Sequence, residues 1–143
     1  MKFKVVQYAK LNSRQKENYN FQKVSALLAD LGFVTLKLSD DWKGADFIAK
    51  HVSGRTLFVQ LKSRLTIDKK YSKTTPYICF PSKLRVWYLC RHNDLVKLVF
   101  RNTNVRRTVS WAKRGGHSQA HPRRALLPAL EKYRIGSDRV RPA

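Results

Sequence analysis

The sequence predicts a single α/β domain in which one amphipathic helix precedes a series of short strands. Within residues 14–32, apolar residues recur at three- and four-residue steps, which is the period of a helix with one buried face. After Gly32 the pattern changes to alternation and short apolar runs, which are typical of strands. With 143 residues, of which 43% are hydrophobic, the chain has the size of one compact domain.

The elements follow in order from this pattern. The helix is expected over residues 14–32, with Asn12 or Ser13 as its N-cap and Gly32 in the left-handed position after its end. Strands are expected over residues 33–38, 45–50 and 55–63, separated by turns at 39–44 and 53–54. Two further runs of β-formers, 77–80 and 86–90, fit one hairpin. Residues 94–100 are amphipathic, and their apolar pairs fit either a helix or a strand.

The expected domain organisation is a core over residues 1–100 and a basic C-terminal extension over residues 101–143, within one single-domain protein. Residues 65–71 between the third strand and the hairpin are polar and basic. The extension contains one convincing helical pattern, over residues 125–133. We expect most of the extension to be a mobile basic arm whose helix docks on the core.

The charge of the chain indicates its partner. It contains 30 Lys and Arg against 9 Asp and Glu, for a formal net charge of +21. A compact domain with this charge repels itself, which is usually tolerated when the partner is a polyanion. We expect nucleic acid, and DNA rather than RNA. The chain has no apolar run long enough to span a bilayer and no signal-peptide core, so we expect no membrane partner and a cytoplasmic protein that is nucleoid-associated when bound to DNA.

One acid and a Gln-x-Lys pattern lie in neighbouring predicted strands. Asp46 lies in the segment Gly-Ala-Asp-Phe-Ile-Ala, and Gln60 and Lys62 follow the apolar run Leu-Phe-Val. A polar side chain in a central strand needs a partner or a task, and Gln60 and Lys62 share one strand face because side chains repeat every second residue. Asp46, Gln60 and the backbone carbonyl of Leu61 offer oxygen ligands to Mg²⁺. In the alternative reading, Asp46 caps a turn, Gln60 lies in an edge strand and Lys62 is an ordinary surface lysine.

Three segments together carry a resemblance to a known family: the helix end and strand start at residues 24–33, the Asp46 segment at 44–49 and the Gln60 segment at 59–63. With them the chain resembles the PD-(D/E)XK, or restriction-endonuclease-like, nuclease superfamily, over about residues 14–64. Within it, the chain is similar to Mrr-type and Holliday-junction-resolvase-like members that carry Gln-x-Lys.

The resemblance implies a restriction-endonuclease-like αβββαβ core with a mixed central sheet and, in this chain, a basic C-terminal arm. It implies a Mg²⁺-dependent (or Mn²⁺-dependent) DNA endonuclease with Asp46, Gln60 and Lys62 as its catalytic residues. The metal would be held at Asp46, Gln60 and the Leu61 backbone, and Lys62 would be the catalytic lysine. A homodimer is compatible with the resemblance, since such nucleases commonly dimerise.

The first helix departs from the family pattern. Such nucleases often add an acid from this helix, and its place falls at Phe21 or Gln22, neither of which is acidic. Glu17 lies one helical turn earlier and is a candidate metal ligand, although an acid there also favours the helix dipole. The alternative function is therefore a non-catalytic nucleic-acid-binding protein on a degenerate nuclease-like scaffold.

Other residues are candidates for supporting roles. Asp41 is a candidate second metal ligand, and His92 is either a general base or a structural histidine. Trp111 either stacks on bases or attaches the extension to the core. The nucleic-acid-binding candidates are basic residues that follow the site or lie in the extension, together with this tryptophan: Arg64, Lys69, Lys70, Lys73, Arg106, Arg107, Trp111, Lys113 and Arg114.

Overall fold

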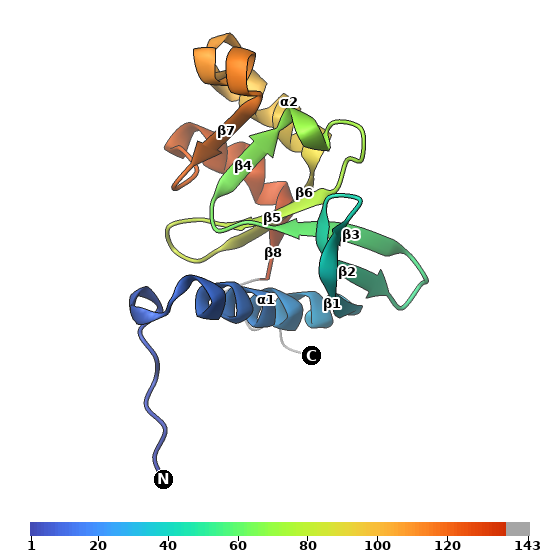
Figure 1. Ribbon diagram of the computed structural model, residues 1–143, viewed down its shortest axis with the longest axis vertical. Helices are drawn as coiled ribbons and strands as arrows, with labels where there is room; N and C mark the ends of the chain where they lie inside the picture. The colour runs from blue at the N-terminus through green and yellow to red at the C-terminus, as the bar shows by residue number, and fades with distance from the viewer. Residues whose placement is uncertain (137–143) are drawn as a thin grey trace.

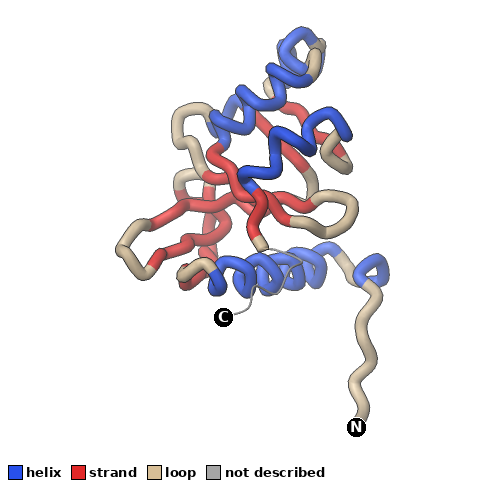
Figure 2. The backbone as a smooth tube through the Cα atoms, turned by 180° about the vertical axis from the view of Figure 1, so that it is seen from behind, coloured by secondary structure: helices blue, strands red, loops and turns tan. Residues whose placement is uncertain are grey.

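The computed structural model describes residues 1–136, which form a mixed α/β fold around a central sheet. Helix α1 (Ser13–Asp30) lies along one face of the sheet. On the other side lie α2 (His92–Asn102), α3 (Leu127–Leu130) and a small second sheet (Figure 1). Figure 2 shows the same arrangement from behind, with the N-terminal residues extending away from the start of α1.

Helix α1 begins and ends where the sequence predicts. The side chain of Asn12 accepts a 2.9 Å hydrogen bond from the backbone N–H of Gln15, whose side chain accepts one of 3.0 Å from the Asn12 N–H. This reciprocal pair is a capping box, which satisfies N–H groups that the first turn leaves free. Gly32 follows the helix with a φ of +87°, a conformation that glycine adopts without a steric penalty. The buried face of α1 carries Val24 and Leu28.

The central sheet is mixed and six-stranded. Its order is β1 (Phe33–Trp42), β2 (Ala45–His51), β3 (Thr56–Leu61), β5 (Tyr77–Pro81), β6 (Trp87–Arg91) and β8 (Arg134–Ile135). Neighbouring strands are antiparallel except β3 and β5, which are parallel. The predicted α/β class with a mixed central sheet is confirmed.

The connection between the parallel strands β3 and β5 differs in detail from an αβββαβ core. It consists of β4 (Leu65–Asp68) and the 3₁₀ turn η2 (Lys69–Tyr71), so an extra strand occupies the place of the crossover helix. β4 pairs with β7 (Gly116–Gln119) in the small second sheet. Within the polar segment 65–71, Leu65 and Ile67 alternate into the core, and two apolar residues are too few to reveal a strand by pattern alone.

The undecided segment after β6 is the helix α2. Its Leu95, Leu98 and Val99 are buried in one hydrophobic cluster with Ile78 of β5 and Leu65 of β4. The three- and four-residue spacing of these leucines and valine places them on one helix face, and packing on the sheet decides the conformation.

More of the extension is packed than a mobile arm would be. After the last residues of α2, the described part of the extension contains η3 (Val105–Arg107), the π-helical turn η4 (Ser110–Arg114), β7, η5 (Arg124–Leu126), α3, η6 (Glu131–Tyr133) and β8. Val105, Leu126 and Leu130 are buried in the core. The predicted helix 125–133 is confirmed as a continuous helical run, in which the central α-helical turn α3 is flanked by the 3₁₀ turns η5 and η6. Residues 137–143 lie outside the described part of the chain. Within residues 1–136, no helix has the length and apolar character needed to cross a membrane.

Candidate active site

Asp46, Gln60 and Lys62 come together on one face of the central sheet. Phe47 pairs with Val59, so Asp46 and Gln60 lie one residue further along β2 and β3, opposite each other. Phe47 and Val59 pack in the cluster that contains Val24 and Leu28 of α1. Because side chains alternate across a strand, Asp46 and Gln60 project from the face away from α1, and Lys62 repeats the direction of Gln60.

Asp46 is held by the neighbouring strand. Its Oδ2 accepts a 2.7 Å hydrogen bond from the backbone N–H of Leu61. Burial raises the pKa of the Asp46 carboxyl above its ordinary value, although the Leu61 N–H and the Lys62 ammonium act in the opposite direction. Glu17 and Asp41 raise the same pKa further by charge repulsion. Asp46 is therefore a partly buried carboxylate with acidic and basic groups within electrostatic range.

Gln60 contributes a buried oxygen without a hydrogen-bond partner. Its side chain is 9% exposed, and its Oε1 accepts no hydrogen bond within the described part of the chain. An unsatisfied buried acceptor costs about 1–3 kcal/mol, so a native structure that retains one usually supplies a ligand or water to it. A cation beside Asp46 would satisfy this oxygen.

Glu17 lies one helical turn before the position where the family pattern places an acid. It lines a cavity of about 320 Å³ together with Leu61 and Lys62, at the end of β3. Phe21, where an acid was expected, packs edge-on against Phe47 with the ring centroids 5.2 Å apart. An apolar packing contact therefore occupies that position, and Glu17 one turn earlier is exposed.

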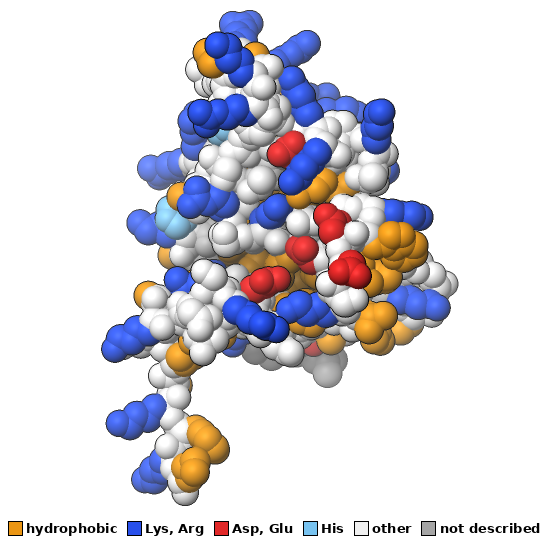
Figure 3. Space-filling view, viewed as in Figure 1, with side chains coloured by type: hydrophobic (Ala, Val, Ile, Leu, Met, Phe, Trp, Pro, Cys, Tyr) orange, Lys and Arg blue, Asp and Glu red, His pale blue; other side chains and the backbone are white. Residues whose placement is uncertain are grey.

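The acids lie within a basic surface. In Figure 3, acidic side chains gather near the middle of one face, over α1 and the neighbouring strands, with Lys and Arg side chains around them. The charges that act on Asp46 come from Glu17 of α1, Asp41 of β1 and Lys62 after β3. Separate elements thus contribute to one small, charged site.

The donor set fits a hard divalent cation. Asp46 offers a carboxylate, and Gln60 offers an amide oxygen without a hydrogen-bond partner. Leu61 follows Gln60 in the sequence and adds a backbone carbonyl, and Glu17 lines the same cavity as Leu61. Mg²⁺ is commonly held by one or two carboxylates, with water and substrate completing its coordination. Among residues 1–136 no group of three or more His, Cys, Asp or Glu side chains is placed to hold a metal, so any ion here would depend on neutral oxygen ligands.

Lys62 is placed near Asp46 without contacting it directly. Its Nζ lies 5.6 Å from the centre of the Tyr71 ring, and that of Lys70 lies 5.0 Å from the same ring. Within the described residues no ion pair of 4.0 Å or less joins Lys62 to Asp46, although the ammonium affects the Asp46 pKa. The ammonium is thus available to a substrate at the site.

His92 has a structural environment. It is fully buried, and its Nε2 accepts a 3.0 Å hydrogen bond from the backbone N–H of Asp68. Its Nδ1 lies 3.0 Å from the Asn93 side-chain oxygen, and burial lowers the pKa of its ring. Both ring nitrogens are engaged with the protein, which supports the structural reading of this histidine.

The nucleic-acid-binding candidates lie in two segments of the chain, one between β3 and β5 and one in the extension. Lys69 and Lys70 lie in η2, Lys73 follows it, and Arg64 lies between β3 and β4; all four are exposed. The candidates of the extension, Arg106, Arg107, Lys113 and Arg114, are exposed in η3 and η4.

Trp111 differs from the other candidates because it is half-buried. Its ring packs edge-on against Phe100 with the centroids 5.2 Å apart, and the Nζ of Lys69 lies 5.3 Å from its centre. The ring attaches η4 to α2, as the tether reading of this residue predicts.

Comparison with known proteins gives distant structural neighbours. No family model matches the chain, and no curated protein matches it. The solved structures similar to it include the bacterial homing endonuclease I-Ssp6803I, at 16% identity and a TM-score of 0.44, over 59% of this chain and 69% of that one. They also include Hjc, a Holliday junction resolvase from Archaeoglobus fulgidus, at 11% identity and a TM-score of 0.44, over 55% of this chain and 74% of that one. At these values neither neighbour assigns a function to this chain.

Proposed function

We propose that this chain is a divalent-metal-dependent DNA endonuclease that hydrolyses phosphodiester bonds at Asp46, Gln60 and Lys62. The observation that carries the proposal is the buried, unpartnered oxygen of Gln60, one strand away from the partly buried carboxylate of Asp46. Burying both groups without a ligand destabilises the fold. A bound cation would contact both groups and offset this destabilisation, which is why we interpret the pair as a cation-binding site.

The residues have distinct roles in this proposal. Asp46, the Gln60 side chain and the Leu61 carbonyl would hold Mg²⁺ or Mn²⁺, with Glu17 as a further carboxylate. A bound divalent ion supplies charge neutralisation at the phosphate and an activated water at neutral pH. The Lys62 ammonium stabilises the negative charge that develops on the phosphate oxygens, since it has no ion-pair partner of its own within the described residues.

The charge distribution supports DNA as the substrate. The net charge of +21 attracts a polyanion, and exposed Lys and Arg side chains surround the acidic site. Acids alone would repel a phosphate backbone at close range, so the basic surroundings are needed to bring the substrate to the metal site.

A second function has one specific observation in its favour. Among the described residues no cluster of three acidic, His or Cys side chains exists, so the metal site would be poor in charged ligands. A nucleic-acid-binding protein that keeps this scaffold and does not cut is the alternative. Salt-dependent DNA binding is expected of both, because each neutralises phosphates.

Cleavage assays separate the two functions. The wild type is incubated with supercoiled, branched and single-stranded DNA in Mg²⁺ or Mn²⁺, beside Asp46→Ala and Lys62→Ala. Asp40→Ala serves as the matched control, because Asp40 is an exposed carboxylate on β1 that does not affect the Asp46 pKa. We expect cleavage by the wild type and the control, and its loss in both site variants. A wild type that binds these substrates and leaves all of them intact would establish the non-catalytic alternative.

A further inference from the structure

Cations and aromatic rings form a continuous series that leads away from Lys62. We call it the cation track. Lys62 and Lys70 both lie over the Tyr71 ring, and Lys69, the next residue back in η2, lies over the Trp111 ring. Tyr71 is buried and Trp111 half-buried, so the rings position the ammonium groups rather than offer faces to a ligand. The Trp111 ring in turn packs edge-on against Phe100.

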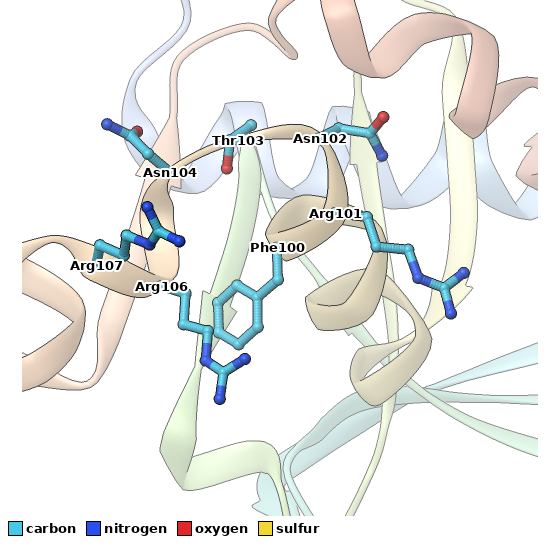
Figure 4. Close-up of a pocket in the computed structure, with 7 residues that line it drawn as sticks. All are labelled: Phe100, Arg101, Asn102, Thr103, Asn104, Arg106 and Arg107. Carbon is cyan, nitrogen blue, oxygen red and sulfur yellow. The ribbon is translucent and has the colours of Figure 1, made fainter.

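Phe100 leads into an arginine-rich hollow at the end of α2. The hollow has a volume of about 710 Å³ and is lined by Phe100, Asn102, Thr103, Asn104 and three arginines, Arg101, Arg106 and Arg107. Figure 4 shows Arg106 extending alongside the Phe100 ring, Arg107 on the side of Asn104, and Arg101 on the opposite side of the helix end. No acidic residue lines the hollow.

Two side chains that line the hollow donate hydrogen bonds to carbonyls near the end of α2. The C-terminus of a helix exposes carbonyl groups, which repel negative charge. Here the Asn102 Nδ2 donates a 2.7 Å hydrogen bond to the Leu98 carbonyl, and the Thr103 hydroxyl donates one of 2.7 Å to the Val99 carbonyl. These two bonds satisfy carbonyls near the end of α2, which reduces the repulsion between this helix end and an anion.

The guanidinium groups of the hollow are free of acidic partners. Within residues 1–136, no ion pair of 4.0 Å or less involves Arg101, Arg106 or Arg107. A planar guanidinium binds a phosphate through two parallel N–H donors, which makes arginine well suited to this ligand. Unpaired arginines around a hollow without acids form a site for a phosphate group.

We propose that the arginine-rich hollow binds a backbone phosphate of the DNA whose strand passes along the cation track from the Asp46 site. The inference rests on the proposed function for its partner, since it takes DNA as the ligand. It adds a contact remote from the cleaved bond, reached through Lys70, Lys69 and the Trp111–Phe100 pair. The C-terminal extension is then part of the DNA-binding surface, while its apolar side chains pack into the core.

The test measures DNA binding without cleavage. A fluorescein-labelled duplex is titrated with Arg101→Ala/Arg106→Ala protein in EDTA over a series of salt concentrations, by fluorescence anisotropy. The control is Lys23→Ala/Lys83→Ala, which removes two exposed charges from α1 and from the β5–β6 turn. Each lost phosphate contact reduces the magnitude of the slope of log K against log salt by about 1, and the hollow is proposed to bind one phosphate, so we expect a decrease of about 1 in the arginine variant. We also expect binding at least about tenfold weaker than that of the control.

A second measurement uses the wild-type protein and is independent of whether the variant folds. Phenylglyoxal modifies accessible arginines, and mass spectrometry locates the modified residues. We expect the duplex to protect Arg101 and Arg106, and inorganic phosphate to protect them only at far higher concentration. Protection by phosphate but not by the duplex, or equal salt slopes in the arginine and control variants, would overturn the inference.

The outcome is separable from that of the nuclease proposal. If the hollow contributes to binding but the wild type leaves DNA intact in Mg²⁺ and Mn²⁺, the inference holds and the nuclease proposal fails. If Asp46-dependent cleavage occurs and the hollow makes no contribution to binding, only the inference fails.

Discussion

The backbone N–H of Leu61 donates a 2.7 Å hydrogen bond to the carboxylate of Asp46. This bond connects β3 to a side chain of β2 and fixes the position of the carboxylate beside Gln60. It also favours the ionised form of Asp46 in a partly buried setting, in which desolvation favours the protonated form. Asp46 is thus positioned at a cost in stability, which is common at functional sites.

The substitution Asp46→Asn should stabilise the metal-free protein at neutral pH. Burial raises the pKa of Asp46 in the folded state above the unfolded value of 3.8. The charge of Asp46 therefore begins to destabilise the fold as the pH rises through 3.8, and the destabilisation is complete once the pH exceeds the folded pKa. Asparagine keeps an oxygen for the Leu61 N–H and removes the charge. We expect a melting temperature about 1–3 °C higher at pH 7, with little difference below pH 3.8, by differential scanning calorimetry. A lower melting temperature at pH 7, with Asp40→Asn unchanged, would contradict this.

Gln60→Leu should separate the structural cost of the unpartnered oxygen from its role in metal binding. Leucine removes the buried acceptor at similar volume, so the free energy of unfolding of the metal-free protein should rise by about 1 kcal/mol. The stabilisation by Mn²⁺ should be lost at the same time. Thermal melts with and without Mn²⁺ measure both quantities. Gln119→Leu is the matched control, because Gln119 also has a buried, unpartnered side-chain atom and lies in β7 of the second sheet; its Mn²⁺ stabilisation should equal that of the wild type.

Lys62→Met should reduce cleavage with little effect on substrate binding. The ammonium is one of 30 basic groups, so its removal changes the overall attraction for DNA only slightly, whereas transition-state charge stabilisation depends on it. We expect kcat to fall about 10²-fold to 10³-fold with KM nearly unchanged. Lys70→Met is the control, since Lys70 lies over the same Tyr71 ring. A fall in kcat of equal size in both variants would remove the special role of Lys62.

Glu17→Gln should lower the pKa of Asp46. Glu17 raises that pKa by repelling the ionised carboxylate, so its neutral replacement makes ionisation easier. The titration of the Asp46 carboxyl carbon, followed by ¹³C NMR in the metal-free protein, should move to lower pH. Mn²⁺ binding should weaken about tenfold, since a carboxylate next to the site is lost. Glu131→Gln, on η6, should leave the Asp46 titration in place.

The elements with a clear period were predictable from the sequence. The amphipathic pattern of α1, its cap at Asn12 and the glycine after it led to the correct helix, and the short apolar runs led to β1, β2, β3, β5 and β6. The segments without a distinct period were not. β4 buries only Leu65 and Ile67, and the apolar pairs of α2 fitted two conformations until its packing on β5 was known.

The candidate site shows the same division. The spacing of Gln60 and Lys62 predicted that both lie on one strand face, because side chains alternate along a strand. The apolar residues that follow Asp46 in its predicted strand marked this acid as unusual. Whether Asp46 lies opposite Gln60 depends on the register between β2 and β3, which is a property of strand pairing. The sequence also named Glu17 as a candidate for the acid missing from the first helix, and the tertiary structure adds that Phe21, at the expected position, packs against Phe47.

By itself, the sequence determined the local secondary structure, the basic character of the protein and the candidate catalytic and metal-binding residues. These follow from composition, from the period of the apolar residues and from the spacing of the polar ones. Tertiary structure decided that the charges of Glu17, Asp41 and Lys62 act on Asp46, and that the extension packs against the core. It also brought η2 beside η4, so that Lys69 meets Trp111. These relationships join residues far apart in the chain, and only the burial of apolar surface from several elements at once brings them together.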